Sequence, residues 1–326
     1  MTAIEFAQEL NQPRHGFSNT GAMTAKTAKA AEPAFVRRAV ASSVLGRAHA
    51  LVLSGLLACA VAAQADNAEA SVDANASDNS ERSASNAANN PVEPRFTLQY
   101  WSYYAPSLNH LNGDAENGEA RVLIPFQIAG VQQIMHIVPP VVTNPTTTSG
   151  PRTGLGNTQL YNFTLGKFDL GLPQKVTFGL GPLVAIPTST STNFGTNKLQ
   201  AGGSGIILAP QSWGLLGVLG TYQQTLSGVS SHVTVAQPLI FFNLPHGYYL
   251  RSSAPMTFDT GSHTSAVPVG LGLGKVIQLD GGYTLNAYAE VQPSLYRAGV
   301  GAPNYQVFTG ISLQLPSHFT SGWNLF

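Results

Sequence analysis

The sequence predicts an all-β protein: a closed antiparallel transmembrane β-barrel of about twelve strands, with ten or fourteen as the alternatives. Three observations predict it, namely two-sided strands, a regular order of long and short connections, and a secretory signal. Successive side chains of a strand point to opposite faces. Barrel strands therefore alternate between apolar residues toward lipid and polar residues toward the interior. A water-soluble sandwich alternates too, so the connections and the signal decide between the two.

The clearest strands lie between Asn243 and Gln292. One side of the segment 283–292 is largely apolar, and the opposite side carries Thr284, Asn286, Tyr288, Glu290 and Gln292. The segment 248–258 repeats the pattern, with Tyr249 and Arg251 on its polar side. We therefore expect five side chains to line a path through the interior: Tyr249, Arg251, Asn286, Tyr288 and Glu290.

Composition excludes several classes of protein. Of 326 residues only 10% are charged, and the formal net charge is zero, whereas soluble domains carry about 25% charged residues. The balance excludes a basic nucleic-acid footprint. One cysteine excludes an internal disulfide and a multi-cysteine metal site. After residue 65 no apolar run is long enough for a transmembrane helix, and nothing in the sequence predicts a cofactor.

Residues 1–65 are expected to form an N-terminal extension and a secretory signal peptide. A basic stretch precedes a short apolar run, and a small-x-small motif ends at Ala65. This order is typical of a secretory signal and predicts cleavage between Ala65 and Asp66. The basic lead is unusually long, so both Met1 and Met23 stay open as the start of translation.

Cys59 has two interpretations. Leu56-Leu57-Ala58-Cys59 resembles a lipoprotein cleavage box, which would leave a lipid on Cys59. Alternatively, Cys59 is a small apolar residue inside the discarded signal. We favour the second, because the site ending at Ala65 is better formed and a barrel needs no lipid anchor.

The rest of the chain divides into three parts. Residues 66–94 are mostly Asn, Ala, Ser and Asp and should form a disordered leader, because they offer too little apolar surface to bury. The barrel is expected over 95–315, followed by a short tail, 316–326. The first strand is rich in aromatic residues, as expected near a membrane interface. The expected strands are 96–104, 119–128, 131–138, 158–168, 174–186, 199–209, 212–224, 231–243, 247–258, 266–277, 282–292 and 303–315.

Long and short connections alternate between these strands. The short ones are Ala129-Gly130, Asp169–Pro173, Pro210-Gln211, Leu244–His246 and Gln278–Gly281. The long ones are Ala105–Gly118, Pro139–Asn157, Pro187–Lys198, Thr225–Ser230, Asp259–Ser265 and Pro293–Ala302. Outer-membrane barrels have short periplasmic turns and long outer loops. The order therefore predicts an outer-membrane location, with the bilayer and the barrel-assembly machinery as partners.

Four prolines fall inside the expected strands. Each lacks the N–H that a strand ladder uses, so each should lie at a bulge or near a rim. They are Pro182, Pro238, Pro255 and Pro268.

Three glycines and one charge pair invite opposing interpretations. Gly270, Gly272 and Gly274 share the interior side of one strand; they either thin the wall and widen the bore, or let a neighbour pack against bare backbone. Arg251 and Glu290 should also face inward, because a charge toward lipid at mid-bilayer costs roughly 2–4 kcal/mol. They either form a constriction that selects solutes by charge or an ion pair that braces the barrel.

The chain from Leu160 to Leu315 resembles a family of Gram-negative outer-membrane proteins, the phenol meta-pathway degradation transporters, sometimes mislabelled neuromedin U. Five short motifs in order carry the resemblance: Gly154–Thr158, Gly181–Thr188, Gly195–Lys198, Asn243–Leu250 and Pro268–Lys275. Asn157 stands where the family tends to have Asp. The resemblance implies a medium-sized barrel that takes up small, often aromatic, molecules.

These observations favour a passive channel for small solutes, aromatic or apolar ones included. A twelve-strand bore should be narrow and partly filled by side chains or by the loop Pro139–Asn157. A structural or adhesive barrel working through its outer loops, and a hydrolase on the rim, are the alternatives. We expect no enzyme, no catalytic residue and no metal site, because the eight histidines are scattered and no Gly-x-Ser-x-Gly or His-Glu-x-x-His motif occurs.

Overall fold

The structure is a computed structural model that describes residues 74–146, 150–169, 171, 175–228, 231–259, 264–319 and 324–325. The predicted signal peptide, its cleavage between Ala65 and Asp66, and Cys59 lie outside the described residues. No described helix is long and apolar enough to cross a membrane.

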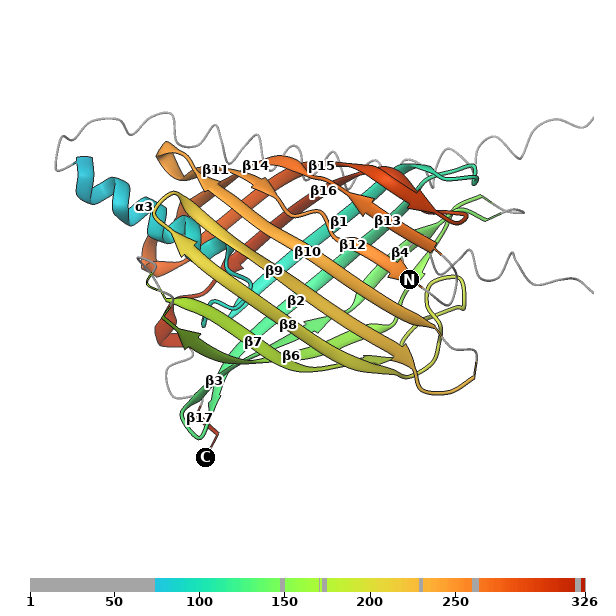
Figure 1. Ribbon diagram of the computed structural model, residues 1–326, viewed down its shortest axis with the longest axis horizontal. Coiled ribbons are helices and arrows are strands. Elements are labelled where there is room, and N and C mark those ends of the chain that lie inside the picture. Colours follow the sequence, from blue (N-terminus) through green and yellow to red (C-terminus); the bar gives the residue numbers. More distant parts are fainter. Residues whose placement is uncertain are drawn as a thin grey trace, which may run out of the picture.

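Twelve antiparallel strands close into a barrel within the described residues (Figure 1). The closing pair is β1 with β16, where Thr97 lies opposite Gln314 and Tyr104 opposite Val307. This pairing confirms the predicted barrel and excludes two stacked sheets. Eight strands are continuous: β1 (Thr97–Leu108), β2 (Ala115–Ile128), β7 (Val176–Ile186), β8 (Gln200–Gln211), β9 (Gly214–Thr225), β10 (His232–Asn243), β15 (Thr284–Ala298) and β16 (Pro303–Gln314).

The other four strands are each interrupted once. Pro139 separates β3 from β4, Pro255 lies between β11 and β12, and Pro268 ends β13 at a bulge. Since proline cannot donate to the ladder, Pro255 and Pro268 agree with the expectation from the sequence. Pro182 and Pro238 do not, because they lie inside the continuous strands β7 and β10. The interrupted strands are β3 (Val131–Val138) with β4 (Pro140–Asn144), β5 (Arg152–Leu155) with β6 (Thr158–Phe168), β11 (Tyr248–Ser252) with β12 (Met256–Asp259), and β13 (Thr264–Pro268) with β14 (Leu271–Gln278).

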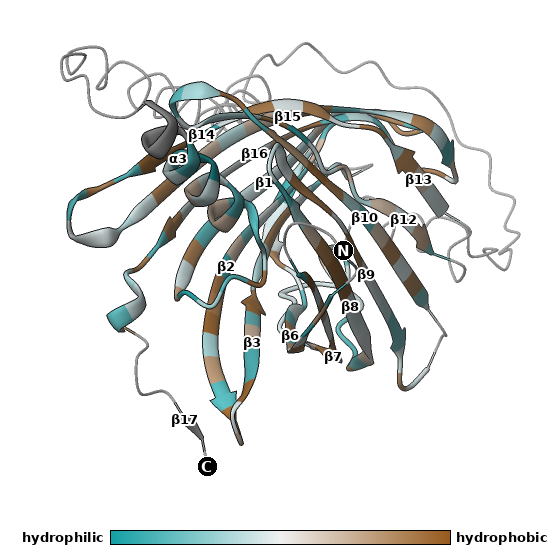
Figure 2. Ribbon diagram, turned by 60° about the vertical axis from the view of Figure 1, so that its left-hand side comes forward, coloured by the Kyte–Doolittle hydropathy of each residue, from teal (hydrophilic) through white to brown (hydrophobic). Residues whose placement is uncertain are grey.

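Hydrophobic and hydrophilic residues alternate along the strands (Figure 2), and many large apolar side chains of the strands are exposed. Leu271 is 71% exposed and Leu180 64% exposed, as expected of side chains that face lipid. On β15, by contrast, Thr284, Asn286 and Glu290 are buried in the interior. The alternation that predicted the strands therefore marks their lipid and interior faces.

Short turns gather at one end of the barrel, which we call the turn end. At the β2–β3 turn, Ala129 has φ 48° and Gly130 has φ 77°. Two positive φ values suit the two-residue hairpin turn that matches strand twist. The 3₁₀ turns η1 (Pro245–Gly247) and η2 (Asp280–Gly282) close two further hairpins there.

The opposite end, which we call the loop end, has shorter loops than predicted. Strands run through most of Ala105–Gly118 and Pro139–Asn157, pairing Ala105 with Ala115 and Val142 with Gly154. The prediction that Pro139–Asn157 is a loop filling the bore is therefore wrong. The strands extend here beyond the apolar band of the outer wall, so these stretches have no row of apolar residues facing lipid. The ladder continues without the alternation, and the exposed Thr143 and Thr153 hydroxyls bond each other at 2.8 Å.

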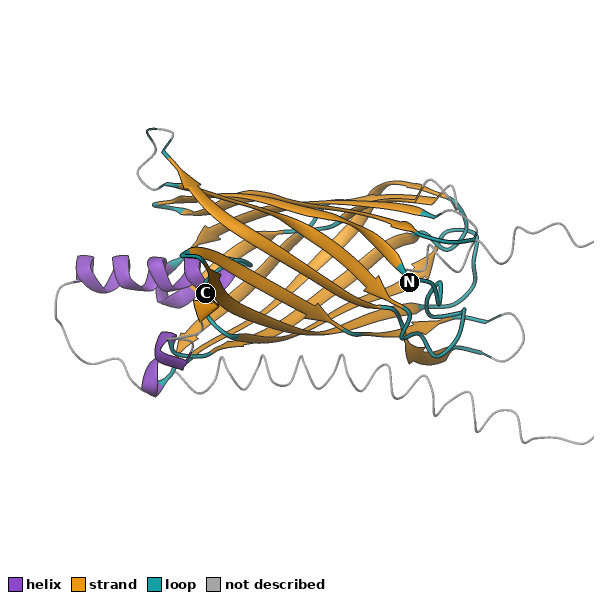
Figure 3. Ribbon diagram, turned by 90° about the horizontal axis from the view of Figure 1, so that it is seen from below, coloured by secondary structure: helices purple, strands orange, loops and turns teal. Residues whose placement is uncertain are grey.

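The prediction that residues 66–94 form a disordered leader is wrong for the part that the structure describes. Helix α3 (Ala74–Asn89) forms within it and lies at the turn end, contacting η1, β9 and β10 (Figure 3). Ser85, Ala88 and Asn89 are buried. Low apolar content predicts disorder here, but polar side chains of the barrel bond this segment and order it.

The C-terminal tail also returns to the turn end. After η3 (Ser317–Phe319), strand β17 (Asn324–Leu325) pairs in parallel with Gln127 and Ile128 of β2. The rings of Phe319 and Phe96 lie 5.9 Å apart. Both termini of the barrel therefore lie at one end, as an even number of strands requires.

Candidate functional site

The barrel interior holds three successive structures: a plug, a brace and a cavity. The plug is residues 85–95, the end of α3 and the chain that follows it into β1. The brace is a buried ion-pair network around Arg251 and Glu290. The cavity lies between the brace and the loop end.

Amide hydrogen bonds hold the plug in the turn end. Asn243 Nδ2 donates to Asn86 Oδ1 at 2.9 Å, and Asn286 Nδ2 donates to Asn89 Oδ1 at 3.2 Å. Asn86 Nδ2 in turn donates to the backbone oxygen of Gln211 at 3.2 Å. Because these bonds join strands β8, β10 and β15 to the helix, they clasp its last turn from several sides of the mouth.

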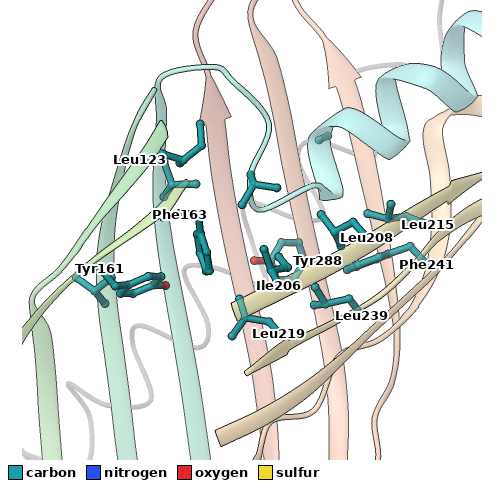
Figure 4. Packing of buried hydrophobic residues seen from close by; sticks show 14 of the residues in the cluster. Leu123, Tyr161, Phe163, Ile206, Leu208, Leu215, Leu219, Leu239, Phe241 and Tyr288 are labelled. Carbon is teal, nitrogen blue, oxygen red and sulfur yellow. The ribbon is translucent and has the colours of Figure 1, made fainter. Parts of the chain in front are cut away.

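The chain beyond α3 enters the core. Val92 is 1% exposed and packs in the apolar cluster that also contains Leu123, Ile134 and Phe163. Figure 4 shows side chains of this cluster reaching the interior from opposite walls. Burial raises the pKa of the nearby Glu93 carboxyl, while its hydrogen bond from Asn90 and the charges of Arg95 and Lys167 act in the opposite direction. The plug thus closes the turn end with backbone, one valine and few charges.

The brace replaces ladder bonds that the prolines interrupt. At the gap between β11 and β12, Ser253 N–H donates to Glu290 Oε1 at 2.8 Å, and Ser253 Oγ donates to Oε2 at 2.8 Å. Arg251 Nε donates to Glu290 Oε2 at 2.9 Å. Glu290 is 1% exposed. One carboxylate therefore satisfies a backbone donor as well as a buried cation.

The predicted glycines give this carboxylate room. A Cβ on Gly270 would overlap Glu290 Oε1, and a Cβ on Gly272 would lie 2.7 Å from the Glu290 Cα. A Cβ on Gly274 would overlap the ring of Tyr249. Of the two interpretations, the structure supports close packing against bare backbone; the bore is filled here and not widened.

Aromatic rings enclose the brace cation. The Arg251 guanidinium lies 3.6 Å from the centre of the Tyr288 ring and 4.9 Å from that of Phe308. Tyr249 donates its hydroxyl to Asn286 Oδ1 at 2.7 Å. All five predicted polar side chains thus face the interior, but they pack against one another.

A second buried arginine lies between the brace and the cavity. Arg121 of β2 donates to Glu119 Oε2 at 2.8 Å and to the Tyr161 hydroxyl. Its guanidinium lies 3.8 Å from the centre of the Trp101 ring. Next along β1, the Tyr103 ring stacks on Phe308 at 4.3 Å. Trp101 and Tyr103 therefore face inward and do not belong to the interfacial belt that the sequence predicted.

The cavity, which we call the vestibule, has a volume of about 240 Å³ and occupies the loop-end half. Pro91 of the plug, Trp101 and Arg121 line its inner part; Ala105, Ala115 and Ala185 are among the small residues further out. The predicted path residues and the three glycines are absent from its described lining. Sequence reasoning missed Trp101, Glu119 and Arg121, although their odd-numbered alternation along 97–103 and 117–123 is the signal that places them inside.

Among the described histidines, His136 is the one that lies buried in the core. His136 is fully buried with its ring 4.6 Å from that of Tyr161, so it packs as a core side chain. Among the described residues, no three His, Cys, Asp or Glu side chains gather as a metal site would require.

Comparison with known proteins supports the fold. No protein-family model and no curated protein matches this chain. Its structure is similar to an outer membrane channel from Pseudomonas putida F1, with 12% identity, a TM-score of 0.50, and 68% of this chain and 96% of that chain covered. The fold is that of an outer membrane β-barrel.

Two further barrels match less well. Outer membrane phospholipase A from Escherichia coli has 12% identity and a TM-score of 0.35, with 72% of this chain and 98% of that chain covered. The beta domain of the Bordetella autotransporter BrkA has 13% identity and a TM-score of 0.33, with 67% and 98% covered. With TM-scores this low, neither barrel supports a conclusion about this chain.

Proposed function

We propose that the protein is a passive outer-membrane channel for small uncharged solutes, apolar and aromatic ones among them, closed at the periplasmic side by its own N-terminal segment. One observation carries the proposal: the vestibule reaches from the loop end to Pro91 of the plug. The turn end would face the periplasm, as short turns do in such barrels. The motif resemblance to uptake barrels and assembly by the barrel-assembly machinery belong to the same proposal.

Permeation then requires the plug to move. Its fixed contacts are a few amide hydrogen bonds, each worth about 1 kcal/mol net, and the burial of Ala88 and Val92. A segment held this weakly can exchange between docked and released states. The strands around it keep their ladder in both states, so the wall is unaffected.

Uncharged solutes suit the compensated charges of the interior. Arg121 pairs with Glu119 at 2.8 Å and Arg251 pairs with Glu290 at 2.9 Å. Each of these cations has its own carboxylate, so neither pair adds net charge along the route. Glu116, which accepts a hydrogen bond from Ser102 Oγ at 2.8 Å, adds one negative charge to the vestibule lining, so the described route offers no free cation to an anion.

Planar-bilayer recording of the full chain tests the proposal. Val92→Asp places a carboxylate in the apolar cluster and should release the plug, because an unpaired buried charge is strongly disfavoured. We expect rare openings in the parent protein and frequent ones in Val92→Asp. Ser83→Asp, on the exposed side of α3, is the matched control and should resemble the parent. A silent bilayer from correctly folded Val92→Asp would contradict the channel and favour an adhesive barrel or a hydrolase.

A further inference from the structure

Carboxamide side chains dominate the polar lining of the vestibule. Eight Asn and Gln residues contribute, from strands around the whole circumference. The bonds between them are long: Gln159 Nε2 to Gln223 Oε1 is 3.4 Å, and Gln223 Nε2 to Gln200 Oε1 is 3.4 Å. Such bonds are at the weak end of hydrogen-bond geometry, so these amides can exchange them for bonds to a solute.

Several buried polar atoms of the lining have no protein partner among the described residues. The acceptors are Asn117 Oδ1, Asn144 Oδ1 and Asn157 Oδ1, and the donors are Trp101 Nε1 and Arg121 Nε. Asn144 is 1% exposed and Asn157 is 7% exposed. These atoms are themselves out of reach of water, so the amides with the long bonds are the groups that a solute meets first. An amide offers both donors and an acceptor, and a hydroxyl group matches both.

The vestibule has few charged side chains and no free cation among its described lining residues. The charged side chains among its described lining residues are Glu116, Glu119 and Arg121. Ser102 Oγ donates to Glu116 at 2.8 Å, and Asn117 Nδ2 donates to Glu119 at 2.9 Å. Arg121 is committed to Glu119 and Tyr161. An anionic solute would lose hydration without gaining a free counter-charge, and a cationic solute would find only Glu116, which Ser102 already bonds.

The vestibule is small and has one apolar wall. Leu219, Val235, Leu239 and Pro268 supply apolar surface from β9, β10 and β13. The volume, about 240 Å³, lies below the roughly 300–1,000 Å³ of sites for drug-sized ligands. The site therefore has room for one small ring with an apolar face and polar edges.

We propose that the vestibule is a binding site for a small uncharged ring bearing several hydroxyl groups, a monosaccharide or a cyclitol. Its hydroxyls bond the amides, and its C–H face lies on the apolar wall. This inference deepens the proposed channel by naming a solute class for it. Binding does not depend on plug movement, so the two proposals can fail separately.

Tryptophan fluorescence tests the site in the full chain. Trp213→Phe with Trp323→Phe leaves Trp101, at the inner end of the vestibule, as the remaining tryptophan. The detergent-solubilised protein is titrated with glucose and myo-inositol, and calorimetry compares glucuronate, glucosamine and phenol. We expect a saturable change in Trp101 emission with glucose or myo-inositol and at least tenfold weaker binding of the other three. No saturable change, or tighter binding of phenol or an ion, would overturn the inference.

Amide variants locate the ligand. Gln223→Leu removes one carboxamide from the lining and should weaken glucose binding about tenfold, the change expected when a hydrogen bond is lost and its partner left unsatisfied. Gln133→Leu, a buried amide outside the vestibule, is the control and should bind as the parent does. Thr221→Val tests the same wall if Gln223→Leu does not fold. Unchanged binding in the folded lining variant would contradict the site, whereas binding by a protein that never conducts would refute the channel alone.

Discussion

The two halves of the interior differ although the same strands line both. The turn-end half is solid: Tyr249, Arg251 and Glu290 fill it, and glycines opposite them leave the space those side chains need. The loop-end half is hollow, with small residues such as Ala105 and Ala266 lining the vestibule. Eight-strand barrels are filled and sixteen-strand barrels are open. In a twelve-strand barrel, the size of each interior residue decides which part is filled.

The brace and the plug close the interior in different ways. The brace is built from the wall and holds a proline-interrupted seam together, so opening it would cost the barrel its ladder contacts. The plug is a separate segment whose amides bond the rim. We therefore expect changes in the brace to alter stability, changes in the plug to alter conductance, and changes in the vestibule to alter binding.

The largest effect is expected in the brace. Arg251→Leu leaves Glu290 buried without its cation and should lower the free energy of unfolding by about 3–5 kcal/mol, measured by urea titration in lipid vesicles. Arg121→Leu is the partner experiment in the hollow half. Its carboxylate, Glu119, has a side chain 18% exposed, so water can replace the arginine and the loss should be smaller, about 1–3 kcal/mol. Equal losses would remove the distinction between the halves.

Glycine-to-alanine substitutions should change the free energy of unfolding differently on the interior face and on the lipid face. Gly274→Ala places a methyl group in the Tyr249 ring and should cost about 1–3 kcal/mol of unfolding free energy. The nearest atom to a Cβ at Gly220 is the Val235 oxygen at 3.8 Å. Gly220→Ala should therefore be neutral or stabilise by up to about 1 kcal/mol. A neutral Gly274→Ala would show that the solid half is loosely packed.

Loss of the amide hydrogen bonds between plug and barrel should release the plug without lowering the stability of the barrel. Asn86→Ala with Asn89→Ala removes three barrel-to-plug bonds from the plug side, about 3 kcal/mol together, so the released fraction should rise more than tenfold. Single-channel open probability and protease cleavage within 85–95 measure that fraction. The urea midpoint of the barrel serves as the control and should shift little. An unchanged open probability would mean that these amide hydrogen bonds do not hold the plug.

The smallest effect concerns pH. Burial raises the pKa of Glu93 when the plug is docked, so the docked state binds its proton more tightly than the released state. Docking is therefore favoured below the ordinary pKa, 4.5, and weakens as pH rises through the raised value. Open probability should increase modestly with pH in the parent and be insensitive in Glu93→Gln. An opposite slope would contradict burial of this carboxyl.

Sequence reasoning succeeded where lipid imposes alternation. The strands around 283–292 were placed correctly because their apolar row faces lipid. At the loop end the row ends while the ladder continues, so stretches such as 115–118 looked like loops. The helix α3 was missed because its partners, Asn243 and Asn286, are distant in sequence. Alternation put Arg251 and Glu290 inside, but only their geometry distinguishes a brace from a selective constriction.

A cross-linking experiment tests most directly whether the plug is the gate. Asn89→Cys with Asn286→Cys, in a Cys59→Ser background, is treated with a short bis-methanethiosulfonate that joins plug to barrel and is cleaved by reductant. Asn89→Cys alone, treated identically, is the control. We expect the cross-link to abolish bilayer conductance and reduction to restore it, with the control unaffected. Undiminished conductance through the fully cross-linked barrel would contradict it.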